Sequence, residues 1–102
     1  QRYKPDKPTN FCFLLQIIAG PKGVEGEESF DVVVCTPQWL AENIQPDKPL
    51  IGRHHLIVKG YNYDLIIRTI EKYCENCIGE NWDECATVLG RLGKWEFEDY
   101  RE

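Results

Sequence analysis

The residues best suited to chemistry are the acids of the stretch Trp95-Glu96-Phe97-Glu98. Apolar and acidic residues alternate there, which is the spacing of a β-strand. Trp95 and Phe97 should therefore be buried in a core, while Glu96 and Glu98 project together from the opposite face. Two carboxylates on one face could form the acid–base pair of a glycoside hydrolase. That reaction needs a substrate cleft, however, and a chain of 102 residues without a long loop offers little room for one. A solvated strand face and a partner-binding face are the other two interpretations.

The distribution of charge favours a partner. Residues 1–70 carry eight acids and eight bases, whereas residues 71–102 carry nine acids and four bases, so the formal net charge of −5 comes entirely from the second part. An acidic end of this kind suits a basic partner. Scattered Lys and Arg residues argue against nucleic-acid binding, which needs clustered positive charge. The predicted partner-binding residues are Glu96, Glu98, Asp99, Asp83 and Glu84.

Thiol or metal chemistry is the alternative. Cys74 and Cys77 have the C-x-x-C spacing that can bind zinc, and Cys85 follows. A closed site needs a fourth ligand, but His54 and His55 are adjacent on a predicted strand and should face opposite sides. The paired cysteines also fall on the apolar side of a predicted helix, in its last turn. We therefore expect five reduced, structural cysteines, with no catalytic residue, no metal and no cofactor.

The elements that must position these residues follow from periodicity and capping. We expect one domain over residues 1–102, with residues 1–10 as a loosely ordered lead-in and the native N-terminus missing before Gln1, since the chain contains no Met. Hydrophobic patterns predict strands at 11–19, 29–35, 53–58 and from 95 onward, with helices from 36, at 64–78 and at 81–92. The β-β-α-β-α-α-β order predicts an α+β fold, a largely antiparallel sheet with helices on one face.

Turn and capping residues set the predicted boundaries. Thr36 before Pro37 is typical of a helix N-cap, and Asp64 and Asn81 are the predicted N-caps of the later helices. Gly79 and Gly93 are the predicted stops. Residues 20–28 hold three glycines and a proline, so they predict a solvated hairpin loop. Its acids form a second surface to test after the first: Glu25, Glu27 and Glu28.

Three blocks of the sequence resemble the immunity protein 8 family. They are FDVVVCTPQWL at residues 30–40, GRHHLIV at 52–58, and WDE at 82–84 followed by LGRLGKWEFEDY at 89–100. The resemblance implies a bacterial, cytoplasmic antidote in a polymorphic-toxin or contact-dependent-inhibition system, without enzymatic activity. Its partner would be the C-terminal domain of a cognate toxin, basic and nuclease-like, bound as a 1:1 complex with a monomer. Nucleic acid and membrane are not expected partners. A thiol- or metal-dependent enzyme and a regulatory adaptor domain remain the alternatives.

Overall fold

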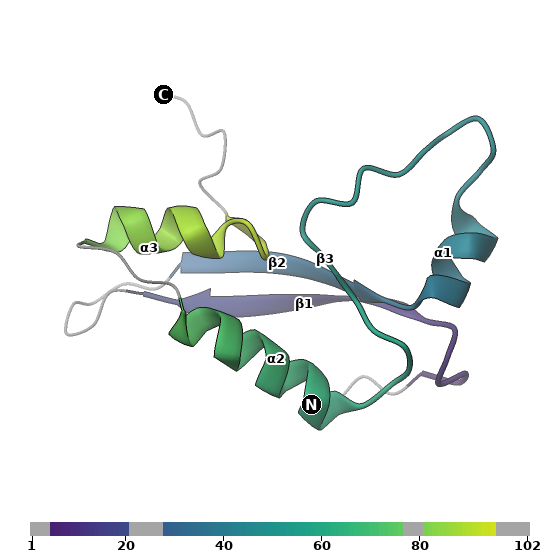
Figure 1. Ribbon diagram of the computed structural model, residues 1–102, viewed down its shortest axis with the longest axis horizontal. Helices are drawn as coiled ribbons and strands as arrows, with labels where there is room; N and C mark the ends of the chain where they lie inside the picture. Colours follow the sequence, from purple (N-terminus) through teal and green to yellow (C-terminus); the bar gives the residue numbers. More distant parts are fainter. Residues whose placement is uncertain (1–4, 21–27, 77–80, 96–102) are drawn as a thin grey trace.

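The computed structural model describes residues 5–20, 28–76 and 81–95. Figure 1 shows a sheet crossed by helices, in the predicted order β-β-α-β-α-α-β, which confirms the α+β class. The elements are β1 (Cys12–Ala19), β2 (Glu28–Cys35), α1 (Pro37–Asn43), β3 (His55–Ile57), α2 (Tyr63–Glu75), α3 (Trp82–Leu89) and β4 (Lys94–Trp95).

Strand β2 lies at the centre of the sheet. It pairs with β1 in the predicted antiparallel hairpin, in a register that places Cys12 opposite Cys35 and Ala19 opposite Glu28. Its other edge pairs with β4, antiparallel, and with β3, parallel. The sheet is therefore mixed, because the connection through α1 brings β3 back in the same direction as β2.

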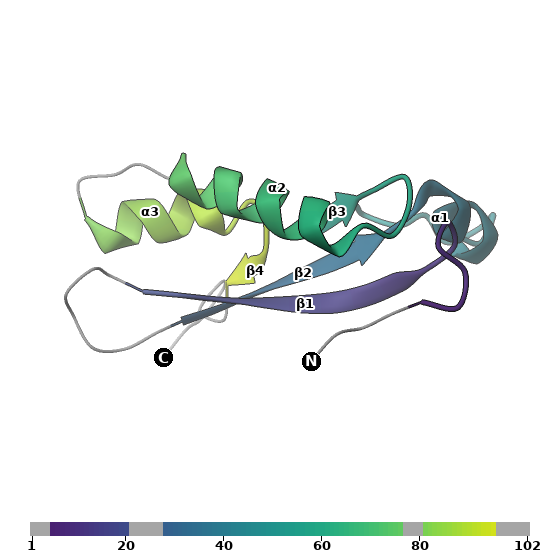
Figure 2. The same cartoon turned by 90° about the horizontal axis from the view of Figure 1, so that it is seen from below.

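The inner face of β2 explains where the core lies. Phe30, Val32 and Val34 follow each other at a spacing of two, and none of them has any exposed surface. Helices α2 and α3 lie together over one face of the sheet (Figure 2). Ile66 of α2 packs in one cluster with the two valines, and Leu89 of α3 packs in a second cluster with Phe30. The period of two in β2 thus fixes which face the helices cover.

Two predicted helix starts are confirmed by their capping hydrogen bonds. The Oγ1 atom of buried Thr36 accepts hydrogen bonds from the backbone N–H of Trp39 and of Phe11, both at 3.3 Å. The Oδ1 atom of Asn81 accepts from the N–H of Glu84 at 3.0 Å. Phe11 directly precedes β1, and Trp39 lies in α1. The Thr36 hydroxyl therefore joins the start of β1 to α1.

Helix α2 differs from its predicted bounds. Its N-cap is Asn62, whose Oδ1 accepts from Leu65 N–H at 3.1 Å, so Asp64 lies in the first turn instead. A carboxylate there still interacts favourably with the helix dipole. The helix ends at Glu75, with Asn76 as its C-cap, before the predicted end at residue 78. Gly79, the predicted stop, lies outside the described residues.

Helix α3 and strand β3 are also shorter than predicted. Helix α3 ends at Leu89, with Gly90 rather than Gly93 as the cap. Strand β3 begins at His55, because His54 has a φ of 61° and therefore lies in the left-handed region. The prediction that both histidines lie on one strand was wrong. His54 Nε2 instead donates to the Gly90 carbonyl at 2.8 Å, which joins the start of β3 to the end of α3.

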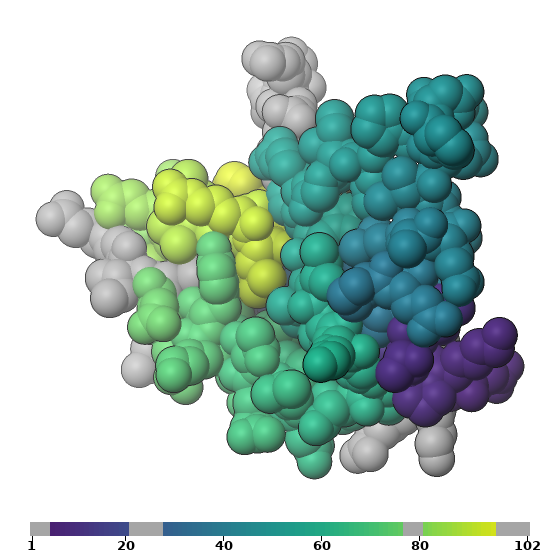
Figure 3. Space-filling model, turned by 45° about the vertical axis from the view of Figure 1, so that its right-hand side comes forward, coloured from purple at the N-terminus to yellow at the C-terminus, as the bar shows by residue number. Residues whose placement is uncertain are grey.

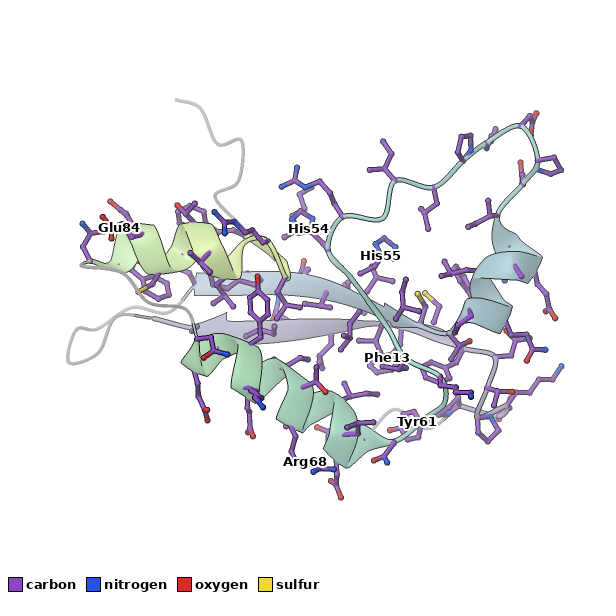
Figure 4. All side chains as sticks on the ribbon, viewed as in Figure 1. Phe13, His54, His55, Tyr61, Arg68 and Glu84 are labelled. Atoms are coloured by element: carbon purple, nitrogen blue, oxygen red, sulfur yellow. The ribbon has the colours of Figure 1, made fainter. Side chains whose placement is uncertain are left out.

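The segment before β1 is held by both side-chain and backbone contacts. Asn10 Nδ2 donates to Glu42 Oε1 of α1 at 2.9 Å, and the Gln38 amide donates to the other carboxylate oxygen. These two hydrogen bonds lower the pKa of Glu42. Tyr61 N–H donates to the carbonyl of Pro8, and its ring meets the edge of Phe11, beside Phe13 (Figure 4).

Gly93 is the position where backbone and core approach most closely. A Cβ atom there would lie 2.8 Å from Val32 Cγ2 and 3.1 Å from Phe30 Cβ. We expect Gly93→Ala to lower the free energy of unfolding by about 1–3 kcal/mol, because both contacts come from buried residues that cannot move freely. Urea denaturation followed by circular dichroism measures the change. The control is Gly52→Ala, since an added Cβ there meets no atom within 4 Å. Equal midpoints for the two variants would contradict the close approach.

Candidate partner-binding surface

The structure places two of the five predicted partner-binding residues. Asp83 and Glu84 lie in the first turn of α3, and both are exposed. Figure 4 shows Glu84 at the outer end of this helix. Acids in a first turn also suit the helix dipole, so their position has a structural explanation as well. Glu96, Glu98 and Asp99 lie outside the described residues.

One carboxylate joins the two chain segments that carry these acids. Glu28 Oε1 accepts a hydrogen bond from the indole Nε1–H of Trp82 at 3.0 Å and another from that of Trp95 at 2.7 Å. Trp82 directly precedes Asp83, and Trp95 directly precedes Glu96. The two acidic segments therefore begin at tryptophans that meet at the same oxygen atom.

The aromatic rings around Phe30 reinforce this junction. The Trp95 ring stacks on the Phe30 ring, with centroids 6.2 Å apart and planes 11° apart. The Trp82 ring meets Phe30 edge-on, at 6.4 Å and 78°. Trp95 is half-buried and pairs with Phe30 across β4 and β2. This agrees with the prediction that Trp95 points inward. The predicted burial of Phe97 falls outside the described residues.

Glu28 corrects the sequence interpretation of the loop acids. It is the first residue of β2, half-buried and hydrogen-bonded, rather than part of a solvated loop tip. Alternate residues of a strand share a face, so Glu28 lies on the same inner face as Phe30. An acid on that face needs hydrogen-bond donors. The spacing of two between Glu28 and Phe30 is visible in the sequence and identifies Glu28 as an inner-face residue. Glu25 and Glu27 lie outside the described residues.

A second surface feature lies at the opposite end of the sheet, where the loop after α1 projects (Figure 1). A hollow of about 230 Å³ opens there, and its apolar wall includes Trp39, Ile44 and Leu50. Ile51, the next residue, is 79% exposed. Figure 3 shows this blue and teal segment covering much of one side of the molecule. The sequence predicts only a connection here, between the helix that begins at residue 36 and the strand at 53–58, because Pro46 and Pro49 end the helical pattern.

The outer face of the sheet also carries exposed apolar side chains. Leu14 and Ile18 of β1 and Ile57 of β3 are each more than half exposed. Their pairing with Val33, Ser29 and Cys35 places them on the face opposite Phe30, Val32 and Val34, which α2 and α3 do not cover (Figure 2). Antiparallel sheets commonly leave one face to solvent, although that face is usually more polar.

Of the residues considered for metal or thiol chemistry, Cys77 lies outside the described residues, and both histidines bond to backbone carbonyls. His55 Nδ1 donates to the carbonyl of Arg53 at 2.7 Å, and His54 bonds to the backbone as described above. Cys74 packs against both hydrophobic clusters, as predicted, and its burial raises its pKa, as does nearby Glu71. Within residues 5–20, 28–76 and 81–95, no three His, Cys, Asp or Glu side chains form a group that could hold a metal ion. In the same residues no helix has the length and apolarity to cross a membrane.

Removing the Glu28 carboxylate should destabilise the junction. Glu28→Ala leaves two partly buried indole N–H groups without this acceptor, so we expect it to lower the free energy of unfolding by about 1–3 kcal/mol. Glu28→Gln keeps an acceptor oxygen and should lose less. Urea denaturation monitored by tryptophan fluorescence reports both the midpoint and the indole environment. Exposed Glu71 provides the matched control as Glu71→Ala. Similar losses in the alanine and glutamine variants would show that the hydrogen bonds are not what Glu28 supplies.

Comparison with known proteins identifies one family. The model of the immunity protein 8 family matches residues 1–100, which is nearly the whole chain. No curated protein and no solved structure matches the chain. The match covers the central strand, the three helices and the Trp82–Trp95 junction together, and on this basis the chain belongs to the immunity protein 8 family.

Proposed function

We propose that this chain neutralises a cognate toxin domain by binding it and covering its active site, with no reaction of its own. The family match over residues 1–100 is the observation that carries the proposal. A protein that acts by occlusion needs a rigid surface rather than a catalytic site. The Glu28 junction supplies rigidity at the acidic end of the chain, because it joins β2, α3 and β4. The proposed complex is 1:1 and forms in the cytoplasm.

The proposed contact surface is the acidic end, made of Asp83, Glu84, Glu96, Glu98 and Asp99. Three observations support it: the net charge of −5 arises in residues 71–102, Asp83 and Glu84 are exposed, and the two acidic segments start from one junction. The partner is a basic domain, of the kind that nucleases present to phosphate groups. Complementary charge would accelerate encounter and select the partner, while a few buried contacts would supply most of the affinity.

Charge reversal tests this surface directly. We expect Glu96→Lys with Glu98→Lys to slow association with the toxin domain encoded beside this chain by about tenfold or more at low salt. The difference from wild type should shrink as salt is added, because exposed charges are screened over about 8 Å at physiological ionic strength. Surface plasmon resonance with the immobilised toxin domain measures both rates. Growth of cells that produce the toxin reports protection in parallel.

Two further variants locate the contact. Glu71→Lys with Glu75→Lys makes the same change in net charge on exposed positions of α2, and it should leave the association rate close to wild type. Ile51→Asp changes the projecting loop beside the apolar hollow, at the other end of the molecule. If only Ile51→Asp weakens binding, the acidic surface is wrong while the antitoxin role stands. If wild type neither binds the toxin domain nor protects cells, the proposed function itself is wrong.

A further inference from the structure

Two cysteines that sequence analysis treated separately face each other across the hairpin. Cys12 of β1 and Cys35 of β2 are directly opposite in the antiparallel register. The N–H of Thr36 donates to the carbonyl of Phe11 at 3.2 Å. The hydrogen bond therefore joins the neighbouring pair, Phe11 and Thr36, and not the two cysteines. The carbonyl of Cys35 accepts from Val58 N–H, on the β3 side, and therefore points away from β1.

This pattern places the cysteines at a non-hydrogen-bonded position of the ladder. Cα atoms of such pairs lie about 4.5 Å apart, and their side chains are on the same face of the sheet. Disulfides form between Cα atoms about 4.4–6.8 Å apart. The backbone therefore already holds Cys12 and Cys35 within the range that a disulfide requires, without a shift of either strand.

The two thiols also differ in access and influence each other. Cys35 has no exposed surface, whereas Cys12 is half-buried. Burial raises the pKa of both thiols, and the charge of Cys12 raises the pKa of Cys35 further, which is consistent with close approach of the sulfur atoms. Both are free thiols in this structure. An oxidant from solvent would therefore meet Cys12 first, and Cys35 would be the second thiol to react.

We propose that Cys12 and Cys35 form a reversible oxidation site, which a small-molecule disulfide such as oxidised glutathione converts to a cross-strand disulfide. The Cys12 thiolate attacks one sulfur of glutathione disulfide, forming a mixed disulfide and releasing one glutathione thiolate. The Cys35 thiolate then attacks Cys12 Sγ, which forms the internal bond and releases the second glutathione. The protein loses two electrons and two protons, and the oxidant is reduced to two thiols. This proposal does not rest on the proposed function.

The oxidised chain should be more resistant to unfolding. A disulfide between these positions ties the edge strand β1 to the central strand and restricts the unfolded chain between residues 12 and 35. We expect the melting temperature to rise by on the order of 10 °C, and to return to its starting value after reduction with dithiothreitol.

The experiment uses the full chain, reduced and then equilibrated with oxidised glutathione at mildly alkaline pH without denaturant. Intact mass should fall by two hydrogens, and peptide mapping without reduction should find Cys12 linked to Cys35. Cys35→Ser should stop at one glutathione on Cys12, because no second thiol resolves it. Cys12→Ser should leave buried Cys35 unmodified. Cys85→Ser, at a half-buried cysteine of α3, is the matched control and should oxidise as wild type does.

Three results would overturn the assignment: both thiols still free at equilibrium, wild type holding glutathione on Cys12 without an internal bond, or a linkage to a different cysteine. The non-reducing peptide map of the wild-type protein is enough to distinguish these three results from the proposed disulfide. The test therefore remains valid even if a serine variant fails to fold.

Discussion

The structure depends on strand β2. Its inner face is buried, and both of its edges pair with other strands. Phe30, Val32 and Val34 have no exposed surface, and every other strand hydrogen-bonds to the strand that carries them. Helices α2 and α3 pack on the face that these side chains form, since Ile66 of α2 clusters with the two valines and Leu89 of α3 clusters with Phe30. The close approach of Gly93 follows from the same crowding, because the chain must pass over Phe30 to reach β4.

Much of this fold can be predicted from sequence because its signals are local. The apolar run of the strand at 29–35 and the Thr36 and Asn81 caps each lie within a few residues, and these predictions are confirmed. The error at His54 arises where a contact between distant residues decides the backbone conformation. His54 adopts a left-handed conformation beside its hydrogen bond to Gly90. The spacing of two from Phe30 already indicates that Glu28 belongs to the strand, but the two tryptophans that donate to it lie far along the chain and could not be found that way.

The candidate surface could also be predicted from sequence only in part. Charge counting located an acidic end, and the structure adds that Trp82 and Trp95 bring its two segments to a common start. Sequence spacing could not reveal that link, since it depends on a third residue in β2. The apolar hollow beside α1 was equally hidden, because its wall comes from both a helix and the loop that follows it. The opposed cysteines required the strand register, which no single segment contains.

The pairing of β4 with β2 has a consequence for how the chain is made. The β1–β2 hairpin is local and can close as soon as residues 12–35 have left the ribosome, whereas Lys94 and Trp95 emerge much later. Until then, the Phe30 end of β2 has neither its neighbouring strand nor α3, so apolar surface and backbone hydrogen-bonding groups stay uncovered. Completion of this side of the sheet therefore waits for the segment that carries β4. Before β4 pairs, this end of β2 would offer its apolar surface and backbone groups to other chains, which favours aggregation.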